Sequence, residues 1–421
     1  MFEVDAKMEM FMDMNLWNKA IQKLIDKGVR SEELMPYTTP EFRVKLAEVM
    51  LSGEYRVAPP HIAKIPKGNG EFREVYVNTV LDRLVLSIIN EVYNQMYDFM
   101  IHPKCVSYQK HIGVKNIIRQ ITKEIGERHI QGYKIDISKY FDSVSKETLV
   151  KQLQKIDTNS CIDEIVKEYY SEDLVMDEDD KLLHHYKSLA QGCAVSAFLA
   201  NTILADVDAA MDKMCNVYYR YSDDIIIIGN REKALKKLTE MLKEKGLKIN
   251  PKKVESLSCD EWFTFLGCNI KGNLVSFSEK SIKNIQREVK KRLPKKPSDL
   301  KKSIKKINTY LYTAYLKNSS AFGWAEYFFS IVNCEKDIIA IDTWIKDILR
   351  GYYRNRKKVG GLGCVKGKDY VIARGTGRNV TANLDKTEGV LEANGYVSMH
   401  HLYKVYQIDK DVYRAEITRR M

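Results

Sequence analysis

The sequence predicts an α+β fold in which small antiparallel sheets lie among many helices. Residues 62–78 and 217–229 each join two strand-like arms across a tight turn, which predicts β-hairpins. Apolar residues recur at helical spacing in most other segments, for example along 79–100. After Phe277 the chain becomes strongly basic, with twelve Lys or Arg and three acids in residues 276–306. We therefore expect two hairpin-containing regions followed by a basic helical one.

The remaining elements follow in chain order from the same patterns. Residues 1–60 predict short helices, and the charged stretch 172–186 predicts a connection without regular structure. Two apolar stripes between Ile282 and Leu311 predict helices with one apolar and one basic face. Residues 359–421 predict a small, partly β segment. Further helices are predicted at 79–100, 114–125, 145–170, 196–213, 231–245 and 335–353, and strands at 132–137 and 262–278.

Composition narrows the class of protein. With 421 residues and 44% hydrophobic content, the chain can bury a sizeable core. A formal net charge of +12 favours a polyanionic partner. The eight cysteines form no C-x-x-C pair, which argues against structural zinc and indicates reduced thiols in a cytoplasmic protein. The start has no signal-peptide pattern, and the apolar runs are too short to span a membrane.

Acidic residues stand at the ends of apolar strands in two places. Asp136 ends the strand-like run from Tyr133, and Asp223 and Asp224 occupy the bend of the hairpin at 217–229. Carboxylates between apolar strands are costly unless a cation neutralises them, and hard oxygen ligands suit Mg²⁺. Two such ions can promote in-line displacement at phosphorus. The alternative, for a bare Asp-Asp, is an ordinary polar hairpin turn.

The order of the motifs around these acids resembles the reverse transcriptases, especially the prokaryotic branch of group II intron maturases, retron enzymes and defence-associated enzymes. The resemblance covers about residues 55–355. It rests on Ile65–Arg73, Leu81–Arg83, Ser107–Lys110, Asp136–Asp142, Gln191–Ser196 with Leu199–Asn201, Tyr221–Asp224, Leu247–Asn250 with Lys253, Phe265–Gly267 and Asp342–Ile345 with Arg350.

The resemblance implies a right-hand polymerase, with fingers, a palm built on a small antiparallel sheet, and a helical thumb. The implied segments are a helical N-terminal element at 1–54, fingers at 55–130, palm at 131–275 with a fingers-type helical insertion at about 145–186, a basic thumb at 276–358, and a C-terminal appendix at 359–421.

It also implies roles for individual residues. Asp136, Asp223 and Asp224 would be the catalytic metal ligands for two Mg²⁺ ions, with Mn²⁺ as a substitute. Deoxynucleoside triphosphates would be bound by Lys67 and Arg73 on the fingers, Phe141 as a gate against the 2′-hydroxyl, Gln191 and Gly192 in a close-approach loop, and Lys253 near the pyrophosphate. Nucleic acid would contact Phe265, Leu266 and Gly267 and the basic residues Lys283, Arg287, Lys290 and Lys291.

The function implied is RNA-directed DNA synthesis on an RNA template, with a DNA product. Three departures favour the defence-associated group and a dedicated structured non-coding RNA: Ala190 and Ala197 replace common prolines, Ser222 replaces a common alanine, and no zinc-binding endonuclease domain follows. A second basic surface carrying Arg374, Arg378, Arg414, Arg419 and Arg420 is predicted to hold that RNA. Alternatives are an intron-type maturase or RNA-binding splicing factor, a protein-primed or template-independent DNA polymerase of the abortive-infection type, and a catalytically inactive RNA-binding module.

Overall fold

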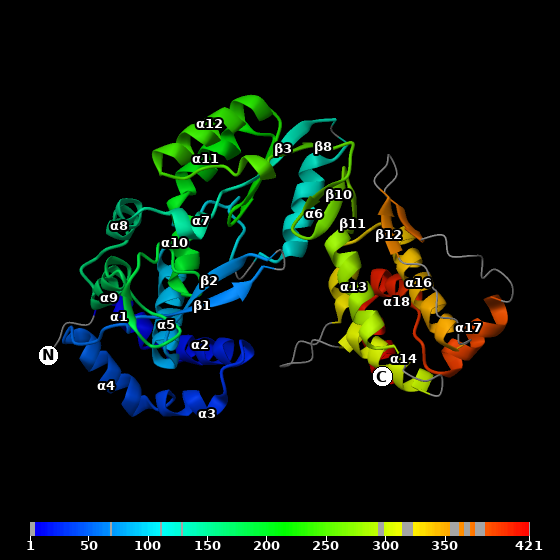
Figure 1. The fold of residues 1–421 in the computed structure, drawn as a ribbon, viewed down its shortest axis with the longest axis horizontal. Coiled ribbons are helices and arrows are strands. Elements are labelled where there is room, and N and C mark those ends of the chain that lie inside the picture. Colours follow the sequence, from blue (N-terminus) through cyan, green and yellow to red (C-terminus); the bar gives the residue numbers. More distant parts are fainter. Residues whose placement is uncertain are drawn as a thin grey trace. The chain divides into compact units, whose positions relative to one another are not determined.

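The computed structural model describes residues 5–67, 70–109, 112–127, 129–293, 299–313, 323–353, 362–365, 371–374 and 384–420 (Figure 1). The chain divides into two compact units, a first unit of Met1–His111 with Gly132–Ser256 and a second unit of Ile112–Gln131 with Leu257–Met421. Residues 112–130, predicted as part of the fingers, thus group with the later part of the chain. The predicted turn residues Gly68 and Asn69, and Arg378, lie outside the described residues.

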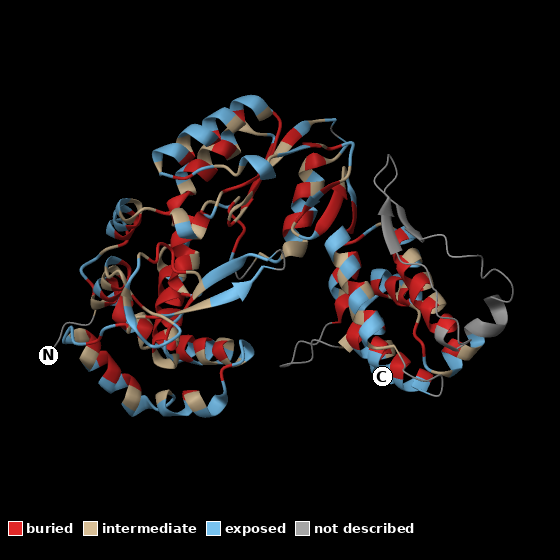
Figure 2. Ribbon diagram, viewed as in Figure 1, coloured by how far each residue is buried: buried red, intermediate tan, exposed pale blue. Residues whose placement is uncertain are grey.

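The predicted short helices at the N-terminus are present. They are α1 (Ala6–Phe11), α2 (Met14–Asp26), α3 (Ser31–Leu34) and α4 (Pro40–Leu51), with a 3₁₀ turn at Met35–Tyr37. Side chains of Asp5, Asp13 and Thr39 cap three of them by accepting backbone N–H bonds. Of these, α1, α2 and α3 pack beside α5 (Val80–Met96), which is buried along most of its length (Figure 2).

A four-stranded sheet flanks this helical core in the order β2-β1-β4-β5. Strands β1 (His61–Pro66) and β2 (Phe72–Val77) form the predicted hairpin. The other two strands, β4 (Leu174–Met176) and β5 (Leu182–His184), lie in the stretch for which we predicted no regular structure. They are only three residues long and mostly not buried, so they leave no alternating apolar pattern in the sequence.

A second four-stranded sheet, in the order β6-β7-β3-β8, contains the acidic strand ends. Its strands are β3 (Gln131–Asp136), β6 (Val217–Tyr221), β7 (Asp224–Ile228) and β8 (Glu255–Ser258). The run Ile225–Ile228 of β7 is fully buried, because this strand is paired on both sides and covered on both faces. The predicted hairpin at 217–229 is confirmed.

The helices of the first unit differ from the prediction at two breaks. The predicted helix 145–170 is two helices, α8 (Lys146–Gln154) and α9 (Cys161–Ser171), because Ser160 caps the start of α9. The predicted helix 196–213 is also two, α10 (Val195–Ile203) and α11 (Ala205–Met214). The other elements are α7 (Tyr140–Ser143), α12 (Arg231–Glu244) and 3₁₀ turns at Asp98–Met100 and Pro251–Lys253.

The second unit combines a three-stranded sheet with helices. The sheet order is β11-β10-β9, from β9 (Phe263–Phe265), β10 (Cys268–Lys271) and β11 (Leu274–Phe277). Both predicted amphipathic helices are present as α13 (Glu279–Lys291) and α14 (Leu300–Asn308). The unit also contains α6 (Val114–Ile125), a π-helical turn at Thr309–Thr313, α15 (Trp324–Phe329) and α16 (Glu335–Tyr353).

The last part of the chain is more helical than predicted. It has a hairpin of β12 (Leu362–Val365) and β13 (Val371–Arg374), followed by α17 (Leu384–Ala393), α18 (Met399–Ile408) and α19 (Lys410–Arg420). Asp342 of α16 accepts hydrogen bonds from the Tyr396 hydroxyl at 2.7 Å and the Met399 amide at 2.7 Å. Residues 394–420 therefore complete the core of the second unit.

No helix in the described part of the chain is long and apolar enough to cross a membrane.

Candidate active site

The three candidate catalytic aspartates meet at one end of the β6-β7-β3-β8 sheet. Asp136, the last residue of β3, pairs in register with Asp224, the first residue of β7. Asp223 lies in the turn between β6 and β7, and its carbonyl accepts the Ile137 amide at 2.9 Å. Ser222 forms the turn with φ of 58°, a left-handed conformation that few residues other than glycine adopt. The antiparallel pairing of the two strands thus brings the two acidic motifs together.

Asp136 is held by two residues of a neighbouring loop. The Lys253 ammonium donates to Asp136 Oδ2 at 2.7 Å, and the Asn250 amide group donates to Oδ1 at 3.4 Å. The Asn250 backbone N–H also donates to the Asp136 carbonyl at 2.8 Å. Lys253, for which we predicted a place near the pyrophosphate, thus lies beside Asp136, and Asn250 fixes its loop.

The surroundings of the other two acids disfavour their charged forms. Burial raises the pKa of Asp223, and the charge of Asp136 raises it further, while Lys253 and Arg73 oppose the shift. Burial likewise raises the pKa of Asp224, with Asp223 and Asp136 adding to it against Lys134. Hydrogen bonding to Asp136 raises the pKa of Lys253. The site therefore holds excess negative charge that favours a cation.

This donor set fits a divalent metal by its chemistry. Partly buried, mutually repelling carboxylates supply the hard oxygen ligands that Mg²⁺ prefers. In the described part of the chain, however, no group of three or more His, Cys, Asp or Glu side chains is arranged as a metal site. Asp136 is paired with Lys253 instead. Metal binding at these residues would therefore require the Lys253 ammonium to give way.

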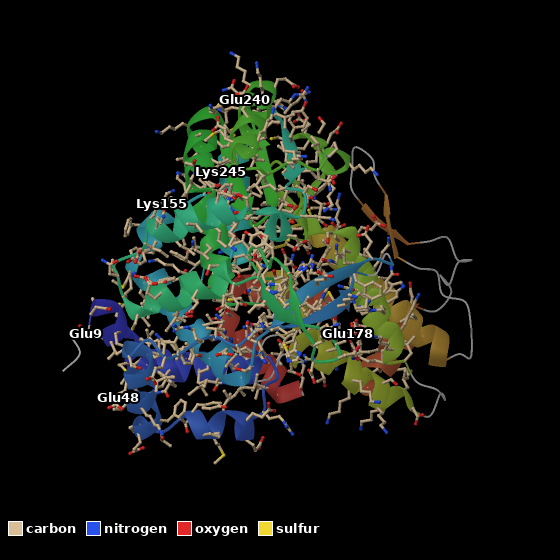
Figure 3. All side chains as sticks on the ribbon, turned by 60° about the vertical axis from the view of Figure 1, so that its left-hand side comes forward. Glu9, Glu48, Lys155, Glu178, Glu240 and Lys245 are labelled. Carbon is tan, nitrogen blue, oxygen red and sulfur yellow. The ribbon has the colours of Figure 1, made fainter. Side chains whose placement is uncertain are left out.

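The strand-end carboxylates differ in burial from the acids on exposed helix faces. Glu9, Glu48 and Glu240, labelled in Figure 3, lie on helix faces and are exposed to solvent. Asp136 is only 7% exposed, and Asp223 and Asp224 are half-buried. An exposed acid needs no partner, whereas a buried one needs a cation or hydrogen-bond donors. Burial therefore separates the strand-end acids from such surface acids, and other buried acids such as Asp163 and Asp208 have a cationic partner of their own.

The two basic candidates on the β1–β2 hairpin are exposed. Arg73 on β2 is close enough for its charge to lower the pKa of Asp223, which places its guanidinium on the aspartate side. The Lys67 ammonium lies 3.7 Å from Glu71 in the same hairpin. The charge of Arg73 thus opposes the rise in the pKa of Asp223, and Lys67 has a partner within its own hairpin.

Hydrogen bonds hold the loop of Gln191 and Gly192 against two neighbouring segments. The Gln191 side-chain amide donates to Asp142 Oδ1 at 3.1 Å, and its carbonyl accepts the Tyr76 amide at 2.6 Å. Gly192 has φ of 113°, and a Cβ there would lie 2.6 Å from the Tyr76 carbonyl oxygen. The glycine is therefore required by the approach of strand β2. This requirement is independent of any bound nucleotide.

One of the sequence departures in this loop has a structural reason. Ala190 has φ of 32°, whereas a proline ring holds φ near about −65°. A proline at this position would force a different loop conformation. The alanine is thus matched to the shape that the loop takes here.

Phe141 follows Asp136 by five residues, is half-buried, and has aromatic neighbours. Its ring centroid is 6.4 Å from that of Tyr108 and 5.8 Å from that of Tyr140. Tyr108 is exposed, has φ of 57°, and lies 6.3 Å from the Tyr221 ring. The sequence analysis did not single out Tyr108, although its motif was recognised. Its left-handed backbone and its ring contacts appear only in the structure.

The nucleic-acid-binding candidates all lie in the second unit. In the predicted primer-contacting hairpin, the Phe265 ring is 1% exposed and belongs to the core. Leu266 and Gly267 form its turn, both at positive φ, and the Gly267 carbonyl accepts the Ser281 hydroxyl at 3.2 Å. Only the turn residues are therefore available to a ligand, and Phe265 supports them from beneath.

The basic candidates share one face of α13. Ile282, Ile285 and Val289 are buried on the opposite face. Together with Gln286, the four candidates line a shallow hollow of about 510 Å³: Lys283, Arg287, Lys290 and Lys291.

Glu288 modifies this basic face. Hydrogen bonds from Arg292 and Lys291 lower the pKa of Glu288 to about 2, so it stays ionised. The Arg292 guanidinium also lies 4.4 Å from the Tyr310 ring centroid. Arg292 therefore has a structural role at the edge of the face.

Comparison with known proteins shows which family this part of the chain resembles. Residues 65–270 match the family model described as reverse transcriptase (RNA-dependent DNA polymerase). The matched region contains the whole β6-β7-β3-β8 sheet, all of the β2-β1-β4-β5 sheet except the first four residues of β1, and every candidate catalytic and nucleotide-binding residue. Residues 65–270 are thus similar to reverse transcriptases, and the predicted α+β fold class is confirmed.

Two curated proteins share sequence similarity with the chain. The "Putative COX1/OXI3 intron 1 protein" of Saccharomyces cerevisiae is 20% identical over 200 residues, covering 47% of this chain and 23% of that protein. "Protein YkfC" of Escherichia coli K12 is 25% identical over 135 residues, covering 30% of this chain and 34% of that protein. The chain therefore spans about a third or less of the length of these relatives.

Solved structures of telomerases are also similar. Apo telomerase from Candida tropicalis has a TM-score of 0.44 at 14% identity, covering 71% of this chain and 58% of that one. The telomerase from Candida albicans in complex with a fragment of telomeric RNA has a TM-score of 0.42 at 10% identity, covering 76% and 64%.

Proposed function

We propose that this chain is an RNA-directed DNA polymerase that extends a primer with deoxynucleoside triphosphates. The observation that supports it most is the register of β3 and β7, which pairs Asp136 with Asp224 and leaves Asp223 in the adjoining turn. The reverse-transcriptase match over residues 65–270 agrees with this assignment. The reaction joins the primer 3′-oxygen to the α-phosphorus and releases pyrophosphate.

Two Mg²⁺ ions bound by Asp136, Asp223 and Asp224 would supply Lewis-acid stabilisation of the attacking and leaving oxygens. The protein residues provide position and charge. Arg73 and Lys67 bind triphosphate oxygens, Arg73 through its planar fork. The Lys253 ammonium, once it has left Asp136, donates a proton toward the departing pyrophosphate. The Phe141 ring fills the space that a 2′-hydroxyl would occupy.

A primer-extension assay tests this function. Purified protein, a DNA primer annealed to an RNA template, Mg²⁺ and the four deoxynucleotides should give a labelled product of template length. Asp223→Asn should give none, while retaining its melting profile and RNA binding. A wild-type protein that binds RNA but extends no primer would support the RNA-binding module instead.

We further infer a biological setting of bacterial antiviral defence, with a structured non-coding RNA as template. The departures at Ala190, Ala197 and Ser222 support this group over intron and retron enzymes. The intron-type maturase is the second candidate, favoured by the similarity to a yeast intron protein. Sequencing the RNA that co-purifies separates the two, because one enriched small RNA supports the first and a flanking intron supports the second.

The basic surface proposed for that RNA needs point changes rather than truncation. Tyr396, Met399 and Tyr413 are buried, so deleting residues 364–421 would expose the core of the second unit. Arg420 pairs with Glu416 at 2.7 Å, and Arg414 lies 3.9 Å from Glu326. Changing Arg414 and Arg419 to Gln should lower recovery of the enriched RNA while leaving extension of a generic primer intact.

A further inference from the structure

A fully buried ion pair lies next to the turn between β6 and β7, which carries Asp223. Arg220, on β6 three residues before Asp223, and Asp208, on α11, are both 0% exposed. Arg220 Nε donates to Asp208 Oδ1 at 2.7 Å, and Nη2 donates to Oδ2 at 2.7 Å. The pair is thus bidentate, which fixes the guanidinium plane as well as its distance.

The remaining donors of this guanidinium go to backbone carbonyls. Nη1 donates to the Ser222 carbonyl at 3.3 Å, inside the turn that precedes Asp223. Nη2 donates to the Asn201 carbonyl at 3.0 Å, near the C-terminal end of α10. Ser222 has φ of 58°, a strained conformation that persists only where its surroundings hold it. Arg220 supplies such a restraint.

The same end of α10 also holds the other acidic motif. The Tyr140 hydroxyl donates to the Ala200 carbonyl at 2.7 Å, four residues after Asp136 in sequence. The Ala200 carbonyl therefore accepts a hydrogen bond from the segment that carries Asp136, and the Asn201 carbonyl accepts one from the segment that carries Asp223. The end of α10 acts as a common reference point for both.

A third segment joins this network. Asn201 Oδ1 accepts the Ser107 hydroxyl at 2.7 Å, and Asn201 Nδ2 donates to the Ser107 carbonyl at 2.7 Å. The Arg220 carbonyl accepts the Val106 amide at 2.9 Å. Ser107 precedes Tyr108, whose ring contacts Phe141. The buried pair is thereby connected to the aromatic side of the site as well.

We propose that Arg220 and Asp208 are positioning residues for the catalytic aspartates, fixing the turn that carries Asp223 and the end of α10, to which the Asp136 segment is also bonded, so that both carboxylates can serve one metal site. The inference rests on the proposed function. Apolar replacement of a buried ion pair is often neutral or stabilising, so stability alone does not explain a pair at this place. Tethers to Ser222 and to the end of α10 are functions that an apolar pair cannot perform.

The test uses a double variant that removes the charges together, Asp208→Leu with Arg220→Met. Removing both partners avoids an uncompensated buried charge, so the fold should survive. The full-length protein is measured for Mn²⁺ binding by electron paramagnetic resonance and for single-nucleotide incorporation. We expect Mn²⁺ affinity and kcat each to fall by about 10–100-fold, with the KM for the nucleotide within about threefold of the wild type.

The chain offers a matched control in the same unit. Lys7 and Asp163 form another fully buried ion pair, 1% and 2% exposed, on α1 and α9. It has no hydrogen bond to the aspartate segments in the described part of the chain. Lys7→Met with Asp163→Leu should change the melting temperature without changing Mn²⁺ affinity or kcat.

Unchanged Mn²⁺ affinity in a folded Asp208/Arg220 double variant would overturn the proposal, as would an equal loss in the Lys7/Asp163 control. If the double variant does not fold, Arg220→Lys decides by the same measurements, because it keeps the charge but loses the fork that reaches Ser222. If the wild-type protein binds Mn²⁺ through Asp223 but makes no DNA, only the polymerase function is refuted. The positioning role is then still tested by comparing the Mn²⁺ affinities of the wild type and the two double variants.

Discussion

The aspartate strands of the first unit and the basic helix α13 of the second arrange charge in opposite ways. The first unit has a small set of partly buried carboxylates, which strand register and hydrogen bonds restrain: Asp136, Asp223 and Asp224. The four cations of α13 are exposed and share one amphipathic face. Buried charges act through position, so a single change has a large effect, whereas solvated charges act through their number. The predictions below test this difference.

The largest effect is expected at the turn between β6 and β7. Asp223→Asn should reduce nucleotide incorporation by more than about a hundredfold, because it removes a ligand whose charge is needed at the transition state. The same change removes a carboxylate whose pKa is raised by burial and by Asp136, so the metal-free protein should melt higher by roughly 1–4 °C. Calorimetry with and without Mg²⁺ measures both states. Retention of a tenth of wild-type activity would refute the ligand role.

The pH dependence should show the same environment. The pKa values of Asp223 and Asp224 are raised, so both groups protonate at a higher pH than the ordinary value of 3.8. Mg²⁺ affinity should therefore fall as pH decreases while still above that value. In the metal-free protein, folding stability changes with pH in the opposite direction. The contribution of the two aspartates to stability is present below their pKa in the unfolded chain and is lost as the pH rises through their pKa in the folded protein. Mg²⁺ titrations from about pH 8 down to about pH 4 check the first expectation. A Mg²⁺ affinity that does not change over that pH range would contradict it.

An intermediate effect is expected at the aromatic side of the site. Phe141→Ala should raise incorporation of ribonucleotides relative to deoxynucleotides by about tenfold, because the cavity then admits a 2′-hydroxyl. Tyr108→Ala provides a comparison, since its ring contacts Phe141 and is more exposed. Competition assays with both nucleotides give the ratio. An unchanged ratio for Phe141→Ala would assign the gate to another residue.

The smallest effect per residue is expected on α13. Changing Lys283, Arg287 and Lys290 to Gln should weaken template–primer binding equally for every sequence, and flatten the dependence of log affinity on log salt by up to about 0.9 per lost phosphate contact. Arg292 is left unchanged because it packs on Tyr310. A matched control is Lys233, Lys236 and Lys237 on α12, which are exposed in the first unit. Equal losses in both variants would show a general charge effect.

The same contrast explains what the sequence could predict. Asp136 and the Asp223-Asp224 pair stand among buried apolar residues, so their place at strand ends followed from pattern and motif order. The α13 face followed from its helical stripe, but which of its cations a ligand would meet did not. Whether a side chain is buried or exposed was missed where no pattern signals it, as for Phe265, which lies in the core.

Long-range hydrogen bonds were the least predictable feature. Asp208 lies twelve residues before Arg220 and on a different element, and Asn201 pairs with Ser107 across 94 residues. No periodicity or spacing connects them. The helix breaks at Ser160 and Leu204 depend on local capping and backbone angles, which a continuous apolar stripe conceals. The three helices after residue 384 were missed because a weakly patterned, glycine-bearing stretch precedes them.

The metal site itself is open to direct observation. A crystal grown with Mn²⁺ and a non-hydrolysable deoxynucleotide should show anomalous density bonded to Asp136 and Asp223, with a second peak about 4 Å away. Lys253 should have left Asp136 Oδ2, to which it donates at 2.7 Å in the metal-free arrangement. Density at these two carboxylates is the result that our account predicts. A nucleotide bound with Lys253 still on Asp136 and no density at the aspartates would contradict it.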